Sequence, residues 1–597
     1  MKLKFTLTSV LLTTTILTNA QNEGITQCGT PTGQKPFPIY EYTELSNPAL
    51  PSSKSWSELK GKTSMGWGST DIRYKQEEAY KNLAKSKQLN AWKGERVNAQ
   101  YVISTPDGID NLTYSVSDLV HNGDKSAVIN QNQILSGIVR YVMTDQANPD
   151  GETACGKRPD HSLFDSSLVA DPIDHHLESI KLEPKSTRSI WVRVWVPEDA
   201  KPGKYTGTLT VNGKKETFSV NVKNRTLPQP EDWKFHLDLW QNPFSIARYY
   251  QVEPWSKEHF DAMKPYAEMM KNMGINVITT SIMHQPWNAQ TEDAYETMIT
   301  WIKKADGTWM FDYTVFDMWV EFMLNQGINK QINCYSMIPW HLSFQYLDQA
   351  TNTFKSIKTK PGEPEFNDMW GAMLTSFSKH LKEKGWFDIT CISIDERPME
   401  HVLKTLALVE SVDKDFKVSF AGTYHEEFAT RVWDYSLAQR IRYPEHIKEK
   451  RKELGYITTY YTCCAEAYPN NFTFSDPAES TWIPIHAATE NIDGYLRWSF
   501  NHWVKEPLLD SRFRDWAAGD TYAIYPGART SIRNERMIEG LQSYEKIKIL
   551  QDELSQKGQT KALIKLNGIL KDFTEQNVKA NGAAIYVNRL NEYLNTL

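Results

Sequence analysis

Two adjacent carboxylates, Asp395 and Glu396, end a strongly apolar segment that begins at Asp388. In a barrel of parallel strands the functional site lies at the carboxyl ends of the strands, so this placement suits a role in chemistry. Neighbouring carboxylates raise each other's cost of ionisation, which keeps one of them protonated near neutral pH and available as a general acid. The alternative from position alone is a structural pair that binds a helix N-terminus or Arg397.

Aromatic side chains follow several of the predicted strands, and polar residues accompany them. A single tryptophan of this kind is more often a core residue than a ligand platform. The aromatic residues repeatedly come just after strands, which favours a solvent-accessible pocket lined by aromatic and polar side chains. Such a pocket suits a sugar because the C–H faces of sugar rings stack on aromatic rings. The aromatic residues are Trp240, Trp287, Trp340, Tyr460, Tyr461, Trp498 and Trp503, and their polar neighbours are His236, Asp238, Gln241, His284, Asn288, Arg497 and Asn501.

The region from about residue 36 to 228 consists of short segments that alternate between apolar and polar residues, as half-buried strands do. The clearest of them runs from Ile190 to Val196. Two more, at 205–211 and 218–222, are separated by an Asn212-Gly213 pair that predicts a tight hairpin. We expect an antiparallel β-sandwich that ends at residues 227–230, where two prolines remove the N–H donors that a strand needs.

Beyond this segment apolar strands alternate with amphipathic helices, the pattern of parallel β/α architecture. Helices are expected around residues 260–270 and 366–381, and a helical tail after about residue 536 is expected to pack on the barrel. Nine candidates compete for the eight strands of a (β/α)8 barrel, so either 433–437 or 521–525 is expected to lie outside it. The candidates are 235–239, 275–280, 331–335, 388–394, 417–420, 433–437, 456–461, 495–499 and 521–525.

The first twenty residues have the features of a cleaved signal peptide, with Lys2 and Lys4 ahead of an apolar stretch that ends in small and polar residues. A membrane anchor needs roughly 20 continuous apolar residues, so the mature chain is expected to have no integral membrane segment. Export, to a periplasm or the medium, is predicted. The 597 residues exceed one hydrophobic core. The predicted organisation is a signal peptide (1–20), a β-sandwich (21–228), a (β/α)8 catalytic domain (229–535) and a helical segment (536–597).

The charge balance and the cysteines exclude several classes of function. With 67 basic and 73 acidic residues the chain is acidic, which argues against a nucleic-acid partner. Cys28 and Cys155 are candidates to pair in an oxidising compartment. Cys463 and Cys464 are adjacent and lack the spacing of a zinc site. No phosphate-binding glycine loop or nicotinamide fingerprint occurs, so no cofactor and no metal is expected.

Five segments, in order along the chain, resemble those of glycoside hydrolase family 123. The resemblance spans roughly residues 190 to 545. It implies a (β/α)8 catalytic domain, β-N-acetylgalactosaminidase activity and an adjacent catalytic pair, which falls on Asp395 and Glu396. The segments are HLDLWQ (236–241), ISIDE (392–396), YYTCC (460–464), GYLRWS (494–499) and YPG (525–527).

The resemblance also implies a mechanism that suits two adjacent carboxylates. An ordinary retaining glycosidase needs carboxyls about 5–5.5 Å apart on opposite sides of the scissile bond, which neighbours at a strand end are poorly placed to supply. If the substrate's acetamido oxygen is the nucleophile, Glu396 acts as acid and base while Asp395 orients the acetamido N–H and stabilises an oxazolinium intermediate. By resemblance, Tyr461 binds the acetamido group and Trp498 or Trp240 lies under the ring. The further candidates for substrate binding are His236, Asp238, His284, Trp340 and Asn501.

Other functions stay open at this point. A β-N-acetylglucosaminidase or an endo-acting hexosaminidase would differ only in details of the pocket. A non-catalytic glycan-binding protein on the same fold is the alternative of another class, but binding alone needs no proton donor, and the chain has both Asp395 and Glu396. The expected partner is a glycan or glycolipid substrate.

Overall fold

The computed structural model describes residues 37–146, 154–158 and 160–597. The predicted signal peptide and Cys28 lie outside these residues. The chain divides into two compact units. The first contains Phe37, Gln241–Ala267 and Val277–Trp433, and the second contains Pro38–Trp240, Glu268–Asn276 and Asp434–Leu597.

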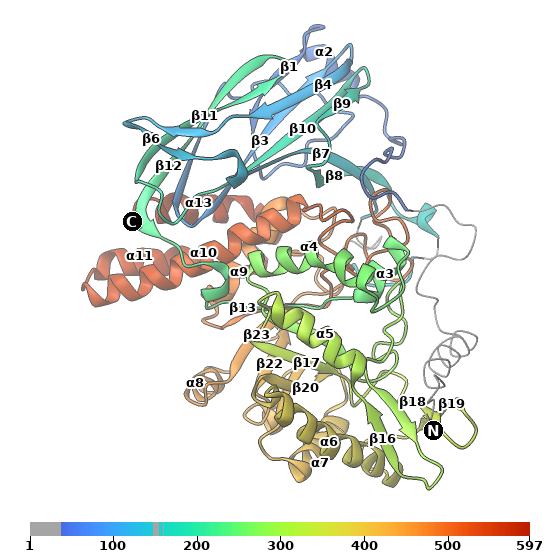
Figure 1. The fold of residues 1–597 in the computed structure, drawn as a ribbon. Coiled ribbons are helices and arrows are strands. Elements are labelled where there is room, and N and C mark those ends of the chain that lie inside the picture. Colours follow the sequence, from blue (N-terminus) through green and yellow to red (C-terminus); the bar gives the residue numbers. More distant parts are fainter. Residues whose placement is uncertain (1–36, 147–153, 159) are drawn as a thin grey trace, which may run out of the picture. The chain divides into compact units, whose positions relative to one another are not determined.

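The second unit contains the β-sandwich that the alternating pattern predicts (Figure 1). A short helix, α2 (Ser53–Glu58), precedes it. One sheet has the strand order β1 (Ser64–Gly68), β3 (Arg96–Thr105), β10 (Ser186–Trp195), β7 (Ile134–Thr144) and β8 (Ser167–Asp174). The other has the order β2 (Ser86–Lys93), β12 (Lys214–Thr226), β11 (Gly203–Val211), β4 (Ile109–Val116) and β9 (Ser179–Leu182), with β5 (Leu119–His121) and β6 (Asp124–Ile129) attached through β11.

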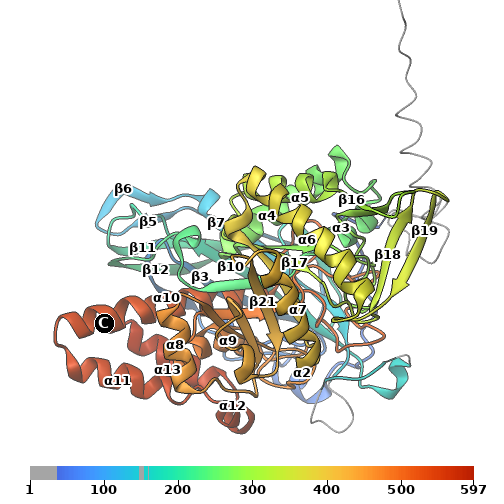
Figure 2. The same ribbon diagram turned by 90° about the horizontal axis from the view of Figure 1, so that it is seen from below.

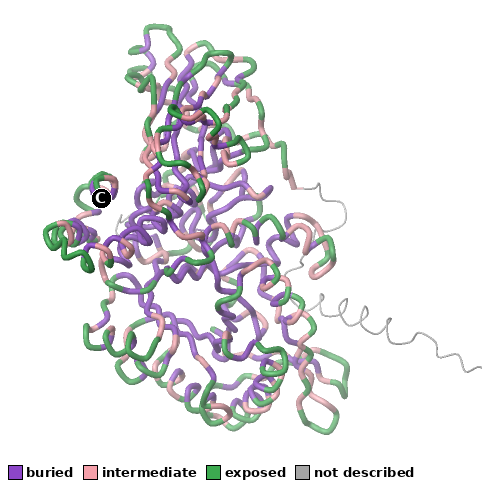
Figure 3. Tube along the Cα trace, turned by 60° about the vertical axis from the view of Figure 1, so that its left-hand side comes forward, coloured by how far each residue is buried: buried purple, intermediate pink, exposed green. Residues whose placement is uncertain are grey.

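The predicted hairpin is confirmed as β11 and β12. Val211 pairs with Lys214, which leaves Asn212 and Gly213 as a two-residue turn with φ angles of +46° and +77°. Asn and Gly tolerate positive φ, which this kind of turn requires at both positions. Apolar residues of both sheets, among them Ile190 of β10 and Phe218 of β12, form one buried core, and Figure 3 shows purple stretches along the sandwich strands.

Eight parallel strands form a barrel-like sheet in the order β13-β24-β23-β22-β21-β20-β17-β14, which confirms the predicted (β/α)8 class. The first unit supplies β14 (Val277–Ser281), β17 (Gln331–Tyr335), β20 (Thr390–Asp395) and β21 (Lys417–Gly422). The second supplies β13 (His236–Leu239), β22 (Asp434–Ala438), β23 (Ile457–Tyr461) and β24 (Gly494–Arg497). The ninth candidate, 521–525, makes only isolated bridges and lies outside the sheet.

The helices of the first unit are α3 (Pro243–Tyr250), α5 (Thr314–Asn325), α6 (Pro364–Lys384) and α7 (Met399–Val412), while α4 (Lys257–Met273) crosses the unit boundary. The predicted apolar stripe of α6 is confirmed. Its buried residues are Phe366, Met369, Trp370, Met373, Leu374, Phe377, Ser378 and Leu381. Helices α6 and α7 pack against each other, as Figure 2 shows.

A four-stranded sheet of the first unit has no counterpart in the sequence prediction. Its order is β16 (Trp309–Asp312), β15 (Thr300–Lys303), β18 (Ser343–Asp348) and β19 (Thr353–Lys358). β15 and β16 lie in the connection after β14, and β18 and β19 lie in the connection after β17. Both connections begin at the carboxyl ends of barrel strands, so this sheet is an elaboration of the end at which Asp395 lies.

The helices of the second unit are α8 (Glu445–Glu453), α9 (Pro477–Thr489), α10 (Ile532–Gln556), α11 (Thr560–Leu570), α12 (Glu575–Asn581) and α13 (Ala584–Leu594). α10 packs on α9 and on strands of the sandwich, and its apolar residues Met537, Leu541, Tyr544 and Ile547 are buried. No helix in the described part of the chain is long and apolar enough to cross a membrane.

Candidate active site

The candidate catalytic pair lies at the end of β20, where consecutive residues enter different environments. Asp395 is the last residue of the strand and is only 6% exposed, whereas Glu396 is exposed. The backbone turns at Glu396, which has a φ of +30°, and its amide donates to the carbonyl of Ala421 (2.7 Å). A non-glycine residue with positive φ costs about 1–3 kcal/mol, and such residues cluster at functional sites.

Asp395 is held through one of its two carboxylate oxygens. The indole N–H of Trp340 donates to Oδ2 (3.1 Å), while Oδ1 is buried and has no hydrogen-bond partner among the described residues. Burial raises the pKa of Asp395 to about 6. The Trp340 hydrogen bond lowers that pKa, the charge of Glu396 raises it and the charge of Arg397 lowers it. The buried oxygen is therefore an acceptor that a bound ligand can use.

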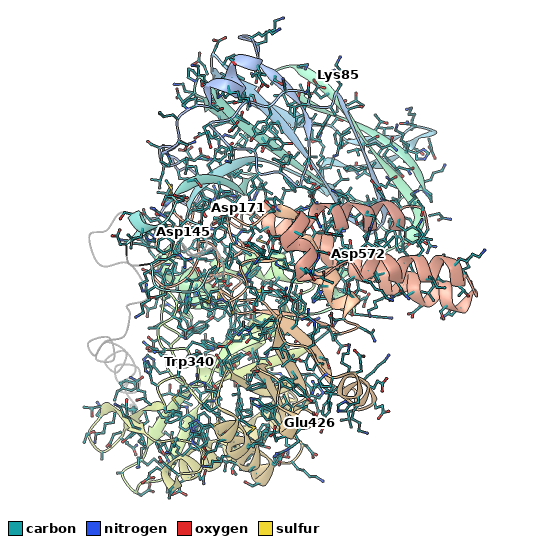
Figure 4. The ribbon with its side chains drawn as sticks, turned by 180° about the vertical axis from the view of Figure 1, so that it is seen from behind. Lys85, Asp145, Asp171, Trp340, Glu426 and Asp572 are labelled. Carbon is teal, nitrogen blue, oxygen red and sulfur yellow. A yellow bond between two sulfur atoms is a disulfide. The ribbon has the colours of Figure 1, made fainter. Side chains whose placement is uncertain are left out.

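Trp340 is labelled in Figure 4 and connects three neighbouring strand ends of the first unit. It lies in the connection after β17, and its backbone N–H donates to the carbonyl of Pro286, in the connection after β14 (3.0 Å). The guanidinium of Arg397, beyond β20, lies 4.1 Å from the centre of the indole ring. The ring is nevertheless 36% exposed.

His284 lies in the connection after β14, two residues before Pro286. Its Nδ1 is 3.1 Å from Glu296 Oε2, in the same connection. Trp287 packs between the rings of Tyr295 and Tyr335, at 4.6 Å and 4.9 Å. The structure thus joins Trp340 to Asp395 by direct contact, and it places His284 in a segment that is hydrogen-bonded to Trp340.

Two polar residues of this region were not among the predicted site residues. Arg397 follows the carboxylates directly, so its position was visible in the sequence. Glu296 had no such signal, because the connection between β14 and β15 has no periodic pattern that fixes which side chains meet. Contact with His284 depends on how that connection folds back on itself.

The second unit places the other predicted aromatic residues at strand ends of its own. Tyr461 is the last residue of β23, and Trp240 directly follows β13. The backbone of Trp240 donates to Arg497 (3.1 Å) and accepts from Phe500 (2.8 Å). Trp240 is 4% exposed, so its ring offers little surface to a sugar. Trp498 retains more exposed surface.

A buried polar network follows β24. Arg497, 2% exposed, donates to Thr462 (2.9 Å), to Asn470 (2.7 Å) and to Asp520 (2.6 Å). Burial raises the pKa of Asp520, which Arg497 and then Trp498 oppose. These contacts fix the segments that carry Tyr461 and Trp498.

Asn501 is also held in this region of the second unit. Its backbone forms an isolated antiparallel bridge with Tyr522, and its side chain is buried at 2% exposure. The ring of His502 lies 5.6 Å from that of Trp498, and burial lowers the pKa of His502 to about 3.

His236 is the first residue of β13, and Asp238 lies one residue before the carboxyl end of that strand. His236 and Asp434 are the first residues of β13 and β22, and their side chains are 3.4 Å apart. Parallel strands begin at one edge of a sheet and end at the other, so this pair lies at the edge opposite to Tyr461. Burial alone would lower the pKa of His236, but Asp434 outweighs it and raises that pKa, with a contribution from Asp238. The pair stabilises the barrel and does not enter the proposed mechanism.

Cys28 was one candidate partner for Cys155, but Cys155 forms a disulfide with Cys464. Cys464 follows Tyr461 by three residues, and its carbonyl accepts a hydrogen bond from Ala154 (2.9 Å). The partner was hidden in the sequence because the two cysteines are 309 residues apart. Among the described residues, no group of three or more His, Cys, Asp or Glu side chains is arranged to hold a metal ion.

Comparison with known proteins identifies both parts of the chain. Residues 240–550 match the family model of the glycoside hydrolase 123 catalytic domain, and residues 67–213 match that of the glycoside hydrolase 123 N-terminal domain. No curated protein sequence matches the chain significantly.

Among solved structures, a family 123 glycoside hydrolase from Clostridium perfringens, studied for glycolipid glycan hydrolysis, is similar. It has a TM-score of 0.81 and 28% identity, and the alignment covers 90% of this chain and 99% of that one. A putative α-galactosidase/melibiase from Bacteroides fragilis aligns over 77% of each chain with a TM-score of only 0.26 and 8% identity, which is too low to bear on the fold. The catalytic-domain match covers more than half of the chain and includes Asp395 and Glu396. The chain belongs to glycoside hydrolase family 123.

Proposed function

We propose that the protein is an exported β-N-acetylgalactosaminidase that releases N-acetylgalactosamine from glycans or glycolipids by a substrate-assisted, retaining mechanism. The observation that carries the proposal is the unlike environment of two adjacent carboxylates. Asp395 is buried and has an oxygen without a partner in the described structure, while Glu396 is exposed at the same strand end. This difference supports a role for Asp395 in receiving a buried polar group of the substrate and for Glu396 in exchanging protons at the scissile bond.

In the first step the acetamido N–H of the sugar donates to Asp395 Oδ1. The acetamido oxygen attacks the anomeric carbon, the bond from that carbon to the leaving oxygen breaks, and Glu396 gives its proton to the leaving oxygen. The positive charge of the resulting oxazolinium is balanced by the carboxylate of Asp395. In the second step Glu396 takes a proton from water, which attacks the anomeric carbon and regenerates the acetamide with retained configuration.

The environment of Asp395 relates this mechanism to pH. Burial raises its pKa to about 6, so the carboxyl is protonated below that pH and ionised above it. A donor at Oδ1 favours the ionised form, so binding of the acetamido group promotes the charge state that the oxazolinium needs. We expect kcat/KM to fall as the pH decreases through about 6, because Asp395 in the free enzyme becomes protonated.

Glycolipid glycans are the substrates proposed here, since the similar Clostridium perfringens enzyme was studied for glycolipid glycan hydrolysis. The family resemblance assigns Tyr461 to the acetamido group and Trp498 to the ring. Contacts of Asn501 and His284 with the substrate also stay predictions, as does export.

A panel of p-nitrophenyl sugars in both anomeric forms tests the proposed specificity. The expected result is preference for the β-linked N-acetylgalactosaminide. A preference for the β-linked N-acetylglucosaminide would support the closest alternative, and release of oligosaccharides only would indicate endo action. Preference for α-linked sugars or for sugars without an acetamido group would contradict the mechanism.

A non-catalytic glycan-binding protein is the alternative from another class. The Glu396→Gln variant distinguishes the two, because it removes the proton donor and leaves the shape of the site nearly unchanged. Turnover by the natural chain that is lost in the variant indicates catalysis. Glycan binding by both proteins, without turnover by either, would indicate a binding protein.

A further inference from the structure

We propose that Trp340 is a positioning residue for Asp395, rather than a platform for the sugar: its indole N–H occupies Oδ2 and so reserves Oδ1 for the acetamido N–H of the substrate. The inference rests on the proposed function for the identity of that donor. The contact itself is a property of the free protein, in which Trp340 Nε1 and Asp395 Oδ2 are 3.1 Å apart.

The two oxygens of Asp395 differ in a way that defines one productive orientation. Oδ2 has a donor, and Oδ1 is buried without a partner among the described residues. A carboxylate that is free to rotate about its Cβ–Cγ bond would present either oxygen to the substrate. Binding of the acetamido group would then have to restrict this rotation, which would weaken the binding. A donor from a neighbouring strand end fixes it in advance.

Trp340 is itself held on two sides. Its backbone N–H donates to Pro286 O (3.0 Å), which anchors the connection after β17 to the connection after β14. The guanidinium of Arg397 lies 4.1 Å from the ring centre and occupies one face of the indole. A cation over that face excludes a sugar ring from it, and the attraction between the cation and the ring is worth most where water is excluded.

The same contact lowers the pKa of Asp395, against the larger effect of burial. Besides burial, the groups that act on this carboxyl are Trp340 from the connection after β17, Glu396 and Arg397 beyond β20, and the backbone N–H of Asp395 itself. Burial and Glu396 favour the protonated form, whereas Trp340 and Arg397 favour the carboxylate. Trp340 therefore supplies a donor at Oδ2 that supports the ionised state without using the oxygen that the substrate needs.

The test compares Trp340→Phe, which keeps an aromatic ring beside Arg397 and loses the N–H, with Trp309→Phe as a matched control. Trp309 is a partly exposed residue of β16 that packs near Lys303 and has no contact with Asp395 among the described interactions. The acid limb is the fall of kcat/KM at low pH, and its midpoint reports the pKa of Asp395 in the free enzyme. In Trp340→Phe this midpoint should rise by about one pH unit, the scale of a lost hydrogen bond to a charged group. Ionisation alone then lowers kcat/KM at pH 6 roughly fivefold. Trp309→Phe should leave the limb unchanged.

A second measurement does not depend on activity. The titration of Asp395, followed by carboxyl NMR in protein labelled at aspartate and assigned with Asp395→Asn, should shift upward in Trp340→Phe. An unchanged titration, or a raised KM with an unmoved acid limb, would overturn the inference and indicate a sugar platform. A shifted titration in a protein that hydrolyses no N-acetylhexosaminide would support the role of Trp340 while contradicting the proposed function.

Discussion

The ends of β20 and β24 contain similar side chains with very different connections. Each has an aspartate, an arginine and a tryptophan close together, and burial raises the pKa of both aspartates. At β24 the arginine is bound directly to Asp520, and it also binds Thr462 and Asn470. At β20 no ion pair joins Arg397 to Asp395 in the described structure, and the arginine lies over an indole ring instead.

This difference indicates that the charged cluster at the end of β24 contributes to stability and that the cluster at the end of β20 serves the chemistry. A buried ion pair with its hydrogen bonds satisfied resists the loss of either partner, because the remaining charge would be buried alone. A buried carboxyl with an open oxygen costs stability in the free protein, and a ligand compensates for that cost. Substitutions at β20 should therefore change activity more than stability, and substitutions at β24 should do the reverse.

The largest effect on activity is expected from Glu396→Gln. The variant removes the proton donor, so hydrolysis of substrates with poor leaving groups should fall roughly 10²–10⁴-fold, while activated aryl substrates lose less. The unfolding temperature should change little, because Glu396 is exposed. Kinetics with leaving groups of graded acidity check this prediction, and an equal loss for all of them would contradict the assigned role.

Asp395→Asn should lower activity and raise stability. The amide loses the charge that stabilises the oxazolinium, so turnover should slow whatever the leaving group, and a thiazoline analogue of the intermediate should bind more weakly than to the natural chain. The pKa of Asp395 is raised from 3.8 to about 6 in the folded state, so ionisation destabilises the fold progressively as the pH rises through this interval. The variant should gain on the order of 3 kcal/mol at pH 7.5 and almost nothing at pH 3.5. Unfolding curves at both pH values measure the gain, and equal gains would show that the charge is not its cause.

The opposite result is expected at β24. Arg497→Met leaves Asp520 buried without its arginine and should lower the free energy of unfolding by about 3–5 kcal/mol. Activity per folded molecule should fall less than in Glu396→Gln. Denaturant unfolding combined with active-site titration by the thiazoline separates the two quantities, and a stable but inactive variant would place Arg497 in the chemistry.

The sequence predicted the architecture well where a periodic pattern decides it. The hairpin β11–β12 followed from alternation and an Asn-Gly turn, and the α6 stripe followed from helical spacing. The additional sheet β15–β16–β18–β19 was missed because its strands are short and partly exposed, so they lack the continuous apolar runs of the barrel strands.

The site was predictable only where a local sequence pattern determines the position of a residue. Asp395 and Glu396 end a strand, and that position can be read locally. The role of Trp340 depends on a contact between residues 55 positions apart. The segment of His236 contains both the start and the end of β13, with Trp240 directly after it, and an apolar run does not fix at which end a given side chain lies.

The smallest effect on activity is expected from removal of the disulfide that the sequence did not identify. Cys155–Cys464 links the connection between β7 and β8 of the sandwich to the connection after β23. Strand β23 pairs with β24, so the disulfide belongs with the β24 end in this comparison. Closing so long a loop restricts the unfolded chain, so Cys155→Ala/Cys464→Ala should cost about 2–4 kcal/mol of stability. Cys463→Ala removes the adjacent thiol, which is not part of the disulfide, and is the matched control, with a smaller loss expected. Because the disulfide lies three residues from Tyr461 and outside the contacts of Asp395, the double variant should keep its acid limb near pH 6 while KM rises modestly. A shifted midpoint of the acid limb with unchanged stability would show that the disulfide acts on the carboxylates. The assignment of activity to the end of β20 and of stability to the end of β24 would then be wrong.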